Sequence, residues 1–270
     1  MQSEVPIHGA LLDWLAVEFR EHGWSQKHLV RLILNSTTYR QTSRITPDLL
    51  QKDPENRLIS RASRFRMPSM ILRDLALSVS GLLNPKMGGK PVYPYQPSEV
   101  WETLAITKER DFTYPASSGP DLYRRSLYTF WRRTIGPTNL FDASARQACK
   151  VRSSLTSTPL HALTTLNDIT WVEASRVLAE HAMQQNPDRS AQIRWAFSKI
   201  LARAPTERDL AKLQPAYEKQ LAIFSADPAG AAAFVAVGSA PKSSLPAVDH
   251  AALSAVCLLL FNLDESLTRQ

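Results

Sequence analysis

The stretch AVDHAALSAVCLLLFNL, residues 247–263, is apolar on nearly every side of a helical wheel. In a globular protein such a helix is buried on most of its surface, so the stretch predicts the centre of a helical core. Its longest near-apolar run, Ala251 to Phe261, is far shorter than the about 20 residues that cross a bilayer, and we expect no membrane span. Cys257 lies inside this run, where apolar neighbours favour an inert, buried thiol.

Helical periodicity extends outward from this stretch over most of the chain. Apolar residues recur at helical spacing over residues 11–19, and a second periodic segment begins after Gly23 and the capping residue Ser25, which predicts a helical hairpin with a short turn. Other helices are predicted at 69–79 and 190–203, and after the capping pairs Asp53-Pro54, Thr158-Pro159, Asn167-Asp168 and Thr206 with Asp209.

The predicted helix after Asn167 carries a mixed pattern. Its apolar residues Val172, Val177 and Leu178 are expected to face the core, and its charged residues Glu173, Arg176 and Glu180 are expected to face outward.

The connectors are long and rich in turn-forming residues. Residues 84–97 read NPKMGGKPVYPYQP, in which prolines and glycines exclude a regular helix and favour an extended loop. Residues 112–114 can form a short strand, and the alanine-rich segment after Asp227-Pro228 is either a helix or a loosely ordered insertion. The sequence therefore predicts a mainly α fold: an irregular helical domain with long Pro/Gly-rich connectors and at most a small β element.

The positive charge of the chain is concentrated in its first half. Residues 1–150 hold 21 Lys and Arg against 14 Asp and Glu, a balance of +7, whereas residues 151–270 hold 11 of each. This asymmetry is compatible with a basic lobe at 1–155 and a neutral lobe at 156–270. A basic surface attracts nucleic acid, anionic polysaccharide or a membrane surface, but its sign alone names no partner.

The stretch YRRSLYTFWRR, residues 123–133, places four arginines among aromatic rings. On a helical wheel its rings gather on one side, so we expect an amphipathic helix whose rings anchor the core. The alternative is a stacking surface for nucleic acid, but the stretch lacks the glycines of known RNA-binding motifs, which argues against nucleic acid as a partner.

Motifs for catalysis and metal binding were not found. The six histidines have no H-E-x-x-H spacing, the two cysteines form no C-x-x-C motif, and no serine lies in G-x-S-x-G. We therefore expect no metal and no cofactor in this chain, and the sequence leaves open whether the domain is an enzyme. Pairing of Cys149 with Cys257 also stays open.

Several segments, taken in order, resemble one family. They include GWSQKHLVRLILNSTTYRQTSR (23–44), YRRSLYTFWRRT (123–134), FDASARQACKVRSSLTSTPLHALTTLND (141–168) and LLLFNLDESLTR (258–269). This ordered set is similar to a planctomycete-specific C-terminal domain of unknown function found in large secreted proteins. The matching segments span Leu11 to Arg269, nearly the whole chain, and the resemblance implies a single domain over residues 1–270.

The resemblance implies a domain context and a location for the protein, but no particular reaction. Related domains follow a signal peptide and a cytochrome-c-like domain, so it implies an extracytoplasmic multidomain protein in which haem is bound only upstream and the upstream domains are partners. The family's usual segment before the first helix is missing here, which implies an N-terminally truncated domain. The motif positions that form a candidate binding site are Arg125, Tyr128, Arg132, Asp142, Arg146, Arg152 and Asn167.

Three hypotheses about function follow from these expectations. The leading hypothesis is a non-enzymatic structural or interaction module, and the alternative is an accessory or catalytic domain acting on anionic polysaccharide. Nucleic-acid binding through the basic N-terminal part is the weakest of the three.

Overall fold

The computed structural model of the chain describes residues 5–98, 100, 114–131, 136–137, 140 and 158–269. Helices dominate these residues, and their one sheet has two strands of two residues each, which confirms the predicted mainly α fold with a small β element. The chain divides into two compact units: unit 1 is Met1–Phe65 with Arg269–Gln270, and unit 2 is Arg66–Thr268. The charge asymmetry suggested a boundary near residue 155 instead, which lies outside the described residues.

Unit 1 contains the predicted helical hairpin. Its described helices are α1 (Gly9–Glu21), α2 (Gln26–Asn35) and α3 (Pro47–Lys52). The chain reverses between α1 and α2 at Gly23 and Trp24, which both have positive φ, 63° and 58°. The Ser25 hydroxyl then accepts a hydrogen bond from the amide of His28 at 3.3 Å, so Ser25 caps α2 as the sequence indicated.

The predicted helix after Asp53-Pro54 is wrong. Thr46 caps α3 instead, and Asp53 follows the end of that helix. The Asp53 carboxylate accepts hydrogen bonds from the amides of Arg57 at 2.7 Å and Leu58 at 3.0 Å, and so it holds a turn. Burial alone would raise the pKa of Asp53, but these backbone bonds, the Ser60 hydroxyl and the Arg61 charge together lower it.

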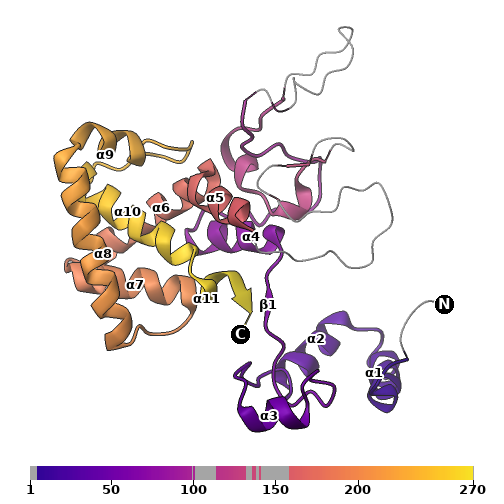
Figure 1. Cartoon of the computed structure of the whole chain (residues 1–270). Coiled ribbons are helices and arrows are strands. Elements are labelled where there is room, and N and C mark those ends of the chain that lie inside the picture. Colours follow the sequence, from indigo (N-terminus) through magenta and orange to yellow (C-terminus); the bar gives the residue numbers. More distant parts are fainter. Residues whose placement is uncertain are drawn as a thin grey trace. The chain divides into compact units, whose positions relative to one another are not determined.

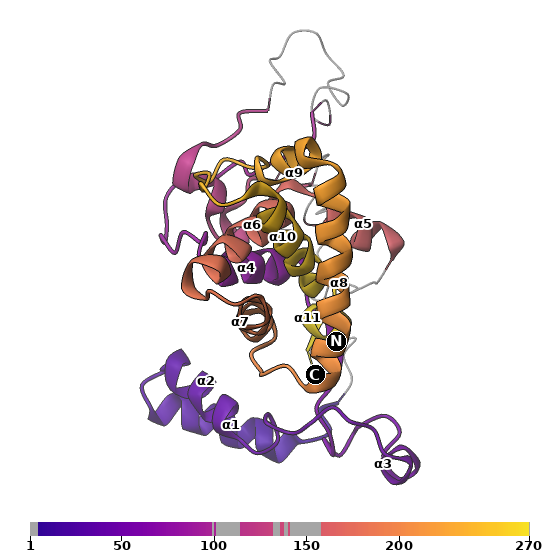
Figure 2. The same ribbon diagram turned by 90° about the vertical axis from the view of Figure 1, so that its left-hand side faces the viewer.

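Unit 2 is built around α10 (Ala247–Phe261), the helix predicted to be central. This helix lies between α6 and α8, and α7 and α9 also pack against it, as Figure 1 and Figure 2 show. The other helices of this unit are α4 (Ser69–Val79), η2 (Gly119–Tyr123), η3 (Ser126–Tyr128), α5 (Pro159–Asn167), α6 (Ile169–Gln185), α7 (Arg189–Leu201), α8 (Glu207–Ala226), α9 (Pro228–Val235) and α11 (Asp264–Leu267). The two strands are β1 (Phe65–Arg66) and β2 (Thr268–Arg269).

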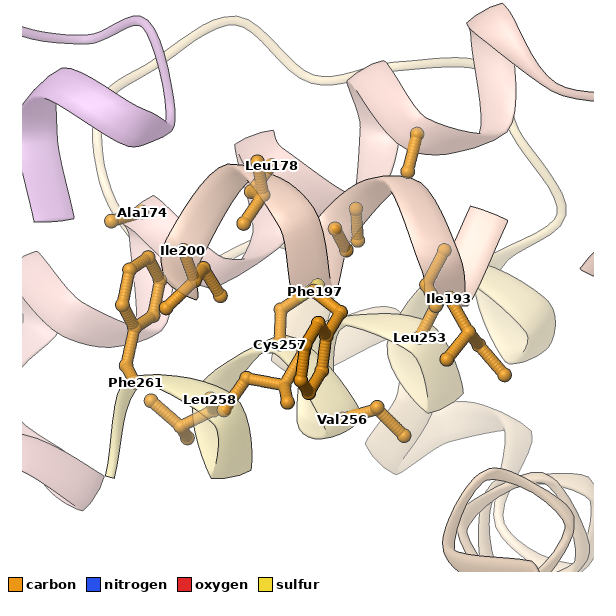
Figure 3. Close-up of a cluster of buried hydrophobic side chains, with 14 of the residues drawn as sticks. Ala174, Leu178, Ile193, Phe197, Ile200, Leu253, Val256, Cys257, Leu258 and Phe261 are labelled. Atoms are coloured by element: carbon orange, nitrogen blue, oxygen red, sulfur yellow. The ribbon is translucent and has the colours of Figure 1, made fainter. Parts of the chain in front are cut away.

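The core of unit 2 forms where α10 meets α6 and α7. Phe197 and Ile193 of α7 lie against Leu253 and Cys257 of α10, and all four side chains are almost fully buried (Figure 3). Cys257 is a free thiol, and burial raises its pKa to about 12, which fits the predicted inert cysteine. Among the described helices, none is both long enough and apolar enough to cross a membrane.

The charged residues of α6 depart from the prediction. Val172, Val177 and Leu178 are buried as expected, but Glu173 and Arg176 are completely buried rather than directed outward. The prediction fails because α6 is enclosed on most sides, and the charged groups find hydrogen-bonding partners inside unit 2.

Residues 123–131, the described part of the stretch YRRSLYTFWRR, do not form the predicted α-helix, so that prediction is also wrong. The chain forms the short 3-10 turns η2 and η3, and it pairs through isolated parallel bridges with Asn84 and Val92 of the extended loop. Its backbone groups are bonded to these distant segments and are not available for a helical ladder. The loop at 84–97 is extended, as predicted.

Several helix ends lie where the capping residues and periodicity of the sequence predicted them. Helix α4 spans the predicted residues 69–79, and α5 begins at Pro159 after the capping residue Thr158. The capping box of Thr206 and Asp209 opens α8, and the segment after Asp227 is the helix α9.

Candidate functional site

Arg124 and Tyr128 together hold the Pro/Gly-rich loop. The Arg124 guanidinium lies 4.0 Å from the centre of the Tyr128 ring and donates hydrogen bonds to the carbonyl groups of Lys86 at 3.0 Å and Gly88 at 2.6 Å. The Tyr128 hydroxyl accepts a hydrogen bond from the Gly88 amide at 2.8 Å. Tyr128, which the sequence predicted as a binding residue, therefore positions the loop. Arg124, which stacks on Tyr128, was not among the residues predicted from the sequence.

Arg73 of α4 organises the backbone of the same region. Its side chain is 1% exposed, and it donates hydrogen bonds to the carbonyl groups of Leu122 and Arg124 at 2.9 Å and to the Ser126 hydroxyl at 3.2 Å. Burial lowers the pKa of Arg73, and the nearby carboxylates of Asp74 and Asp168 act in the opposite direction. This arginine binds the chain internally rather than offering its charge to a ligand.

A second buried polar network joins α6 to the loop before α10. Glu173 accepts hydrogen bonds from the Tyr123 hydroxyl at 3.0 Å and from the Ala240 amide at 2.6 Å. Arg176 donates to the carbonyl groups of Ala240 at 3.2 Å and Pro241 at 3.1 Å. Burial raises the pKa of Tyr123, so its hydroxyl stays protonated and donates to the carboxylate. Glu173 and Arg176 thus hold the loop at Ala240 and Pro241.

The side chains of Ser243 and His250 lie in contact, and a serine beside a histidine can serve as a nucleophile and its general base. The Ser243 hydroxyl lies 3.4 Å from Nδ1 of His250, and Nε2 of that ring lies 2.9 Å from the Arg176 carbonyl oxygen. Since Nε2 donates to the carbonyl group, Nδ1 is left to accept from the serine. Burial lowers the pKa of His250, which keeps the ring neutral, but 3.4 Å is long for proton transfer. The bond from Nε2 of His250 to the Arg176 carbonyl group links α10 to α6.

The structure brings together only part of the predicted binding site. Arg125 is exposed and lies at the start of the turn η3, which ends at Tyr128. Asn167 lies on α5, where its side chain donates to the Leu163 carbonyl at 2.8 Å; the cap of α6, expected at Asn167-Asp168, is Asp168. The remaining candidates, Arg132, Asp142, Arg146 and Arg152, are outside the described residues.

The arginine-rich run at residues 57–73 is not one continuous basic surface. Arg57 and Arg64 are exposed, whereas Arg61 and Arg73 are buried. Arg61 donates to the carbonyl groups of Asp53 and Pro54, both at 2.8 Å. Internal hydrogen bonds therefore use part of the charge that the sequence assigned to a surface.

The hairpin of unit 1 differs from unit 2 in what it leaves exposed. Helices α1, α2 and α3 contain no buried residue, and no described hydrophobic side chain of unit 1 belongs to a buried core. A hollow of about 470 Å³ lies along one face of α2. Its lining residues are Gln26, Lys27, Val30, Arg31, Leu34 and Asn35. The large apolar side chains exposed on the hairpin are Leu11, Leu12, Trp14, Val17, Trp24, Val30, Ile33 and Leu34.

The sequence matches one known protein family over most of its length. Residues 1–217 match the family described as "PSD1: Protein of unknown function (DUF1553)". The chain belongs to this family. No curated protein and no solved structure matches the chain.

The PSD1 match includes all the described helices of unit 1 and ends at residue 217, inside α8. It confirms that the chain is a domain of a family of unknown function, as the ordered motifs indicated. The upstream haem domain and the extracytoplasmic setting stay predictions.

The hairpin also gathers one set of potential metal ligands, which the sequence did not indicate. Glu18 of α1, His22 at its end and His28 of α2 place one ligand atom each within 4.8 Å of one another. Glu18 and His22 are one helical turn apart, a spacing that could have been recognised, but His28 is brought near only by the turn at Gly23.

Proposed function

We propose that this PSD1 chain is a non-enzymatic interaction module in which unit 2 is a stable helical body and the hairpin α1–α2 receives a protein partner. The observation that carries the proposal is the lack of any buried hydrophobic residue among the described residues of unit 1. Burying one large apolar side chain contributes about 1.5–3 kcal/mol. Contiguous exposed apolar surface of this kind marks interaction sites in folded proteins.

The internal polar networks support the same proposal. Arg73, Glu173 and Arg176 are fully buried, and each is bonded to backbone groups of a neighbouring segment. Side chains used in this way stabilise connectors, and they are not available to contact a substrate.

The hollow on α2 indicates the chemistry of the partner. Val30 and Leu34 are its apolar lining residues, Lys27 and Arg31 are its charged ones, and no acidic residue lines it. A complementary ligand is an amphipathic helix with apolar residues in the centre and carboxylates at its edges. We propose such a helix, carried by a protein domain, as the occupant.

The family resemblance suggests where that helix comes from. In the setting that it implies, the partner is an upstream domain of an extracytoplasmic multidomain protein. This setting is part of the proposal, and it rests on the resemblance alone.

Synthetic helices test the proposal on the full chain. Titration calorimetry would compare an amphipathic peptide flanked by glutamates with a peptide of the same apolar face flanked by lysines. We expect the glutamate peptide to bind and the lysine peptide to bind much more weakly. Val30→Asp and Leu34→Asp should each weaken binding about tenfold or more, since these two apolar side chains line the hollow.

Leu127→Asp is the matched control, because Leu127 is an exposed leucine of unit 2, at 64% exposure. It should leave peptide binding unchanged. The proposal is wrong if neither peptide binds, or if Val30→Asp and Leu127→Asp have the same effect. Heparin binding that survives Val30→Asp, in the absence of peptide binding, would favour the anionic-polysaccharide alternative.

A further inference from the structure

We propose that Glu18, His22 and His28 bind one divalent transition-metal ion, with Zn²⁺ as the best match, and that this ion joins α1 to α2. Two imidazoles and one carboxylate form a ligand set found in protein zinc sites. This inference is independent of the partner proposed for the apolar face, because the three residues are not among those that line the hollow on α2.

The sequence brings the three residues together through two local devices. Glu18 and His22 are four residues apart and so lie on one face at the end of α1. The chain then reverses at Gly23 and Trp24, and the Trp24 amide donates to the Phe19 carbonyl group at 2.8 Å. Because Ser25 starts α2, His28 falls in its first turn, beside α1.

The distances between the ligand atoms are close to those of a metal site. Oε1 of Glu18 lies 2.8 Å from Nε2 of His28 and 3.2 Å from Nδ1 of His22. Bonds of about 2.0–2.1 Å to a tetrahedral ion put neighbouring ligand atoms about 3.3 Å apart. Nδ1 of His22 also lies 2.9 Å from the backbone carbonyl oxygen of Glu18, so this ring would exchange a backbone hydrogen bond for the ion, while small side-chain movements bring the three ligand atoms around it.

The two rings must turn before both can bind one ion, because the lone pair of each ligating nitrogen lies in the plane of its ring. The imidazoles of His22 and His28 stack with centroids 3.9 Å apart and planes 8° from parallel, and both direct a nitrogen toward the same carboxylate oxygen. With neutral rings, the ligand set carries a single negative charge, so Zn²⁺ would also neutralise the carboxylate.

Access and coordination number indicate an open site. The side chains of His22, His28 and Glu18 are 46%, 32% and 19% exposed, so an ion can enter from solvent. Three protein ligands leave a fourth position of the tetrahedron to water.

The hairpin gives the ion a clear role. Helices α1 and α2 bury no residue, so their mutual packing contributes little stability. Small structures that lack a core are commonly stabilised by a metal ion, which here would connect the end of the first helix to the start of the second.

Metal titration of the full chain tests the site. After chelator treatment, calorimetry with ZnCl₂ should show one ion bound per chain, and Co²⁺ should give the visible absorption of a tetrahedral complex. Glu18→Gln, His22→Gln and His28→Gln should each weaken Zn²⁺ binding by at least about tenfold, because even outer-sphere partners of zinc contribute that much.

His8→Gln is the matched control, since His8 is an exposed histidine of the same unit and stands outside the cluster. It should bind Zn²⁺ like the wild type. Far-UV circular dichroism of each variant checks that α1 and α2 remain helical. The proposal is overturned if the wild type binds no Zn²⁺, or if folded cluster variants bind it as tightly as His8→Gln.

Discussion

Glu173 and Arg176 illustrate how charged residues are buried in unit 2. Each is completely buried, and each is bonded to the backbone around Ala240. The sequence placed them on the outer face of α6 because charged residues usually face water. No local pattern indicates that the loop before α10 covers them, so this part of the site was not predictable from periodicity.

Gly238 lies in this loop, against the Glu173 side chain of α6. Its φ is +84°, and a Cβ at this position would overlap the carboxylate of Glu173. We expect Gly238→Ala to lower the free energy of unfolding by about 1–3 kcal/mol or more, through backbone strain and through displacement of Glu173. Urea denaturation measures the effect.

Gly88→Ala is the control for this prediction, because Gly88 has a similar φ of +73° with nothing within 4 Å of an added Cβ. It should be less destabilising than Gly238→Ala. Equal losses would mean that the contact with Glu173 adds nothing beyond backbone strain.

At the scale of elements, the loop at 84–97 depends on Arg124. Its guanidinium binds the Lys86 and Gly88 carbonyl groups while stacked on Tyr128. A lysine keeps the charge but lacks the planar fork that makes these bonds together. Arg124→Lys should therefore speed amide hydrogen exchange in the loop, with little change in the helices of unit 2.

Arg125→Lys is the matched control, because the neighbouring Arg125 is exposed. Exchange in the loop should stay at the wild-type rate in this variant. Faster exchange of equal size in both variants would show that Arg124 has no specific role in holding the loop.

Element prediction succeeded where the signal was local. Helix α4 spans the predicted residues, and Thr206 with Asp209 caps α8, because periodicity and capping act within a few residues. The stretch after Tyr123 failed because its backbone binds Arg73, Asn84 and Val92, which are distant in sequence. The ring pattern of this stretch was compatible with a helix, but long-range hydrogen bonds determine its structure.

At the scale of the whole molecule, the two units differ in how they are stabilised. Unit 2 has a core in which α10 packs against α6 and α8, as its apolar sequence indicated. Unit 1 forms the predicted hairpin, yet the described part of it buries no hydrophobic residue. The sequence correctly predicted α1 and α2 but not α3, and periodicity alone could not tell that the apolar faces of the hairpin would lack a core.

Native-state hydrogen exchange of the full, metal-free chain is the most direct test of this difference. Local unfolding costs little free energy where few apolar contacts hold an element. The amides of α1 and α2 should therefore be at least about tenfold less protected from exchange than those of α10. This result would support a hairpin that needs a partner or an ion for stability. Protection of α1 and α2 equal to that of α10 would contradict the account, because it would mean that the hairpin is already fully stabilised within the chain.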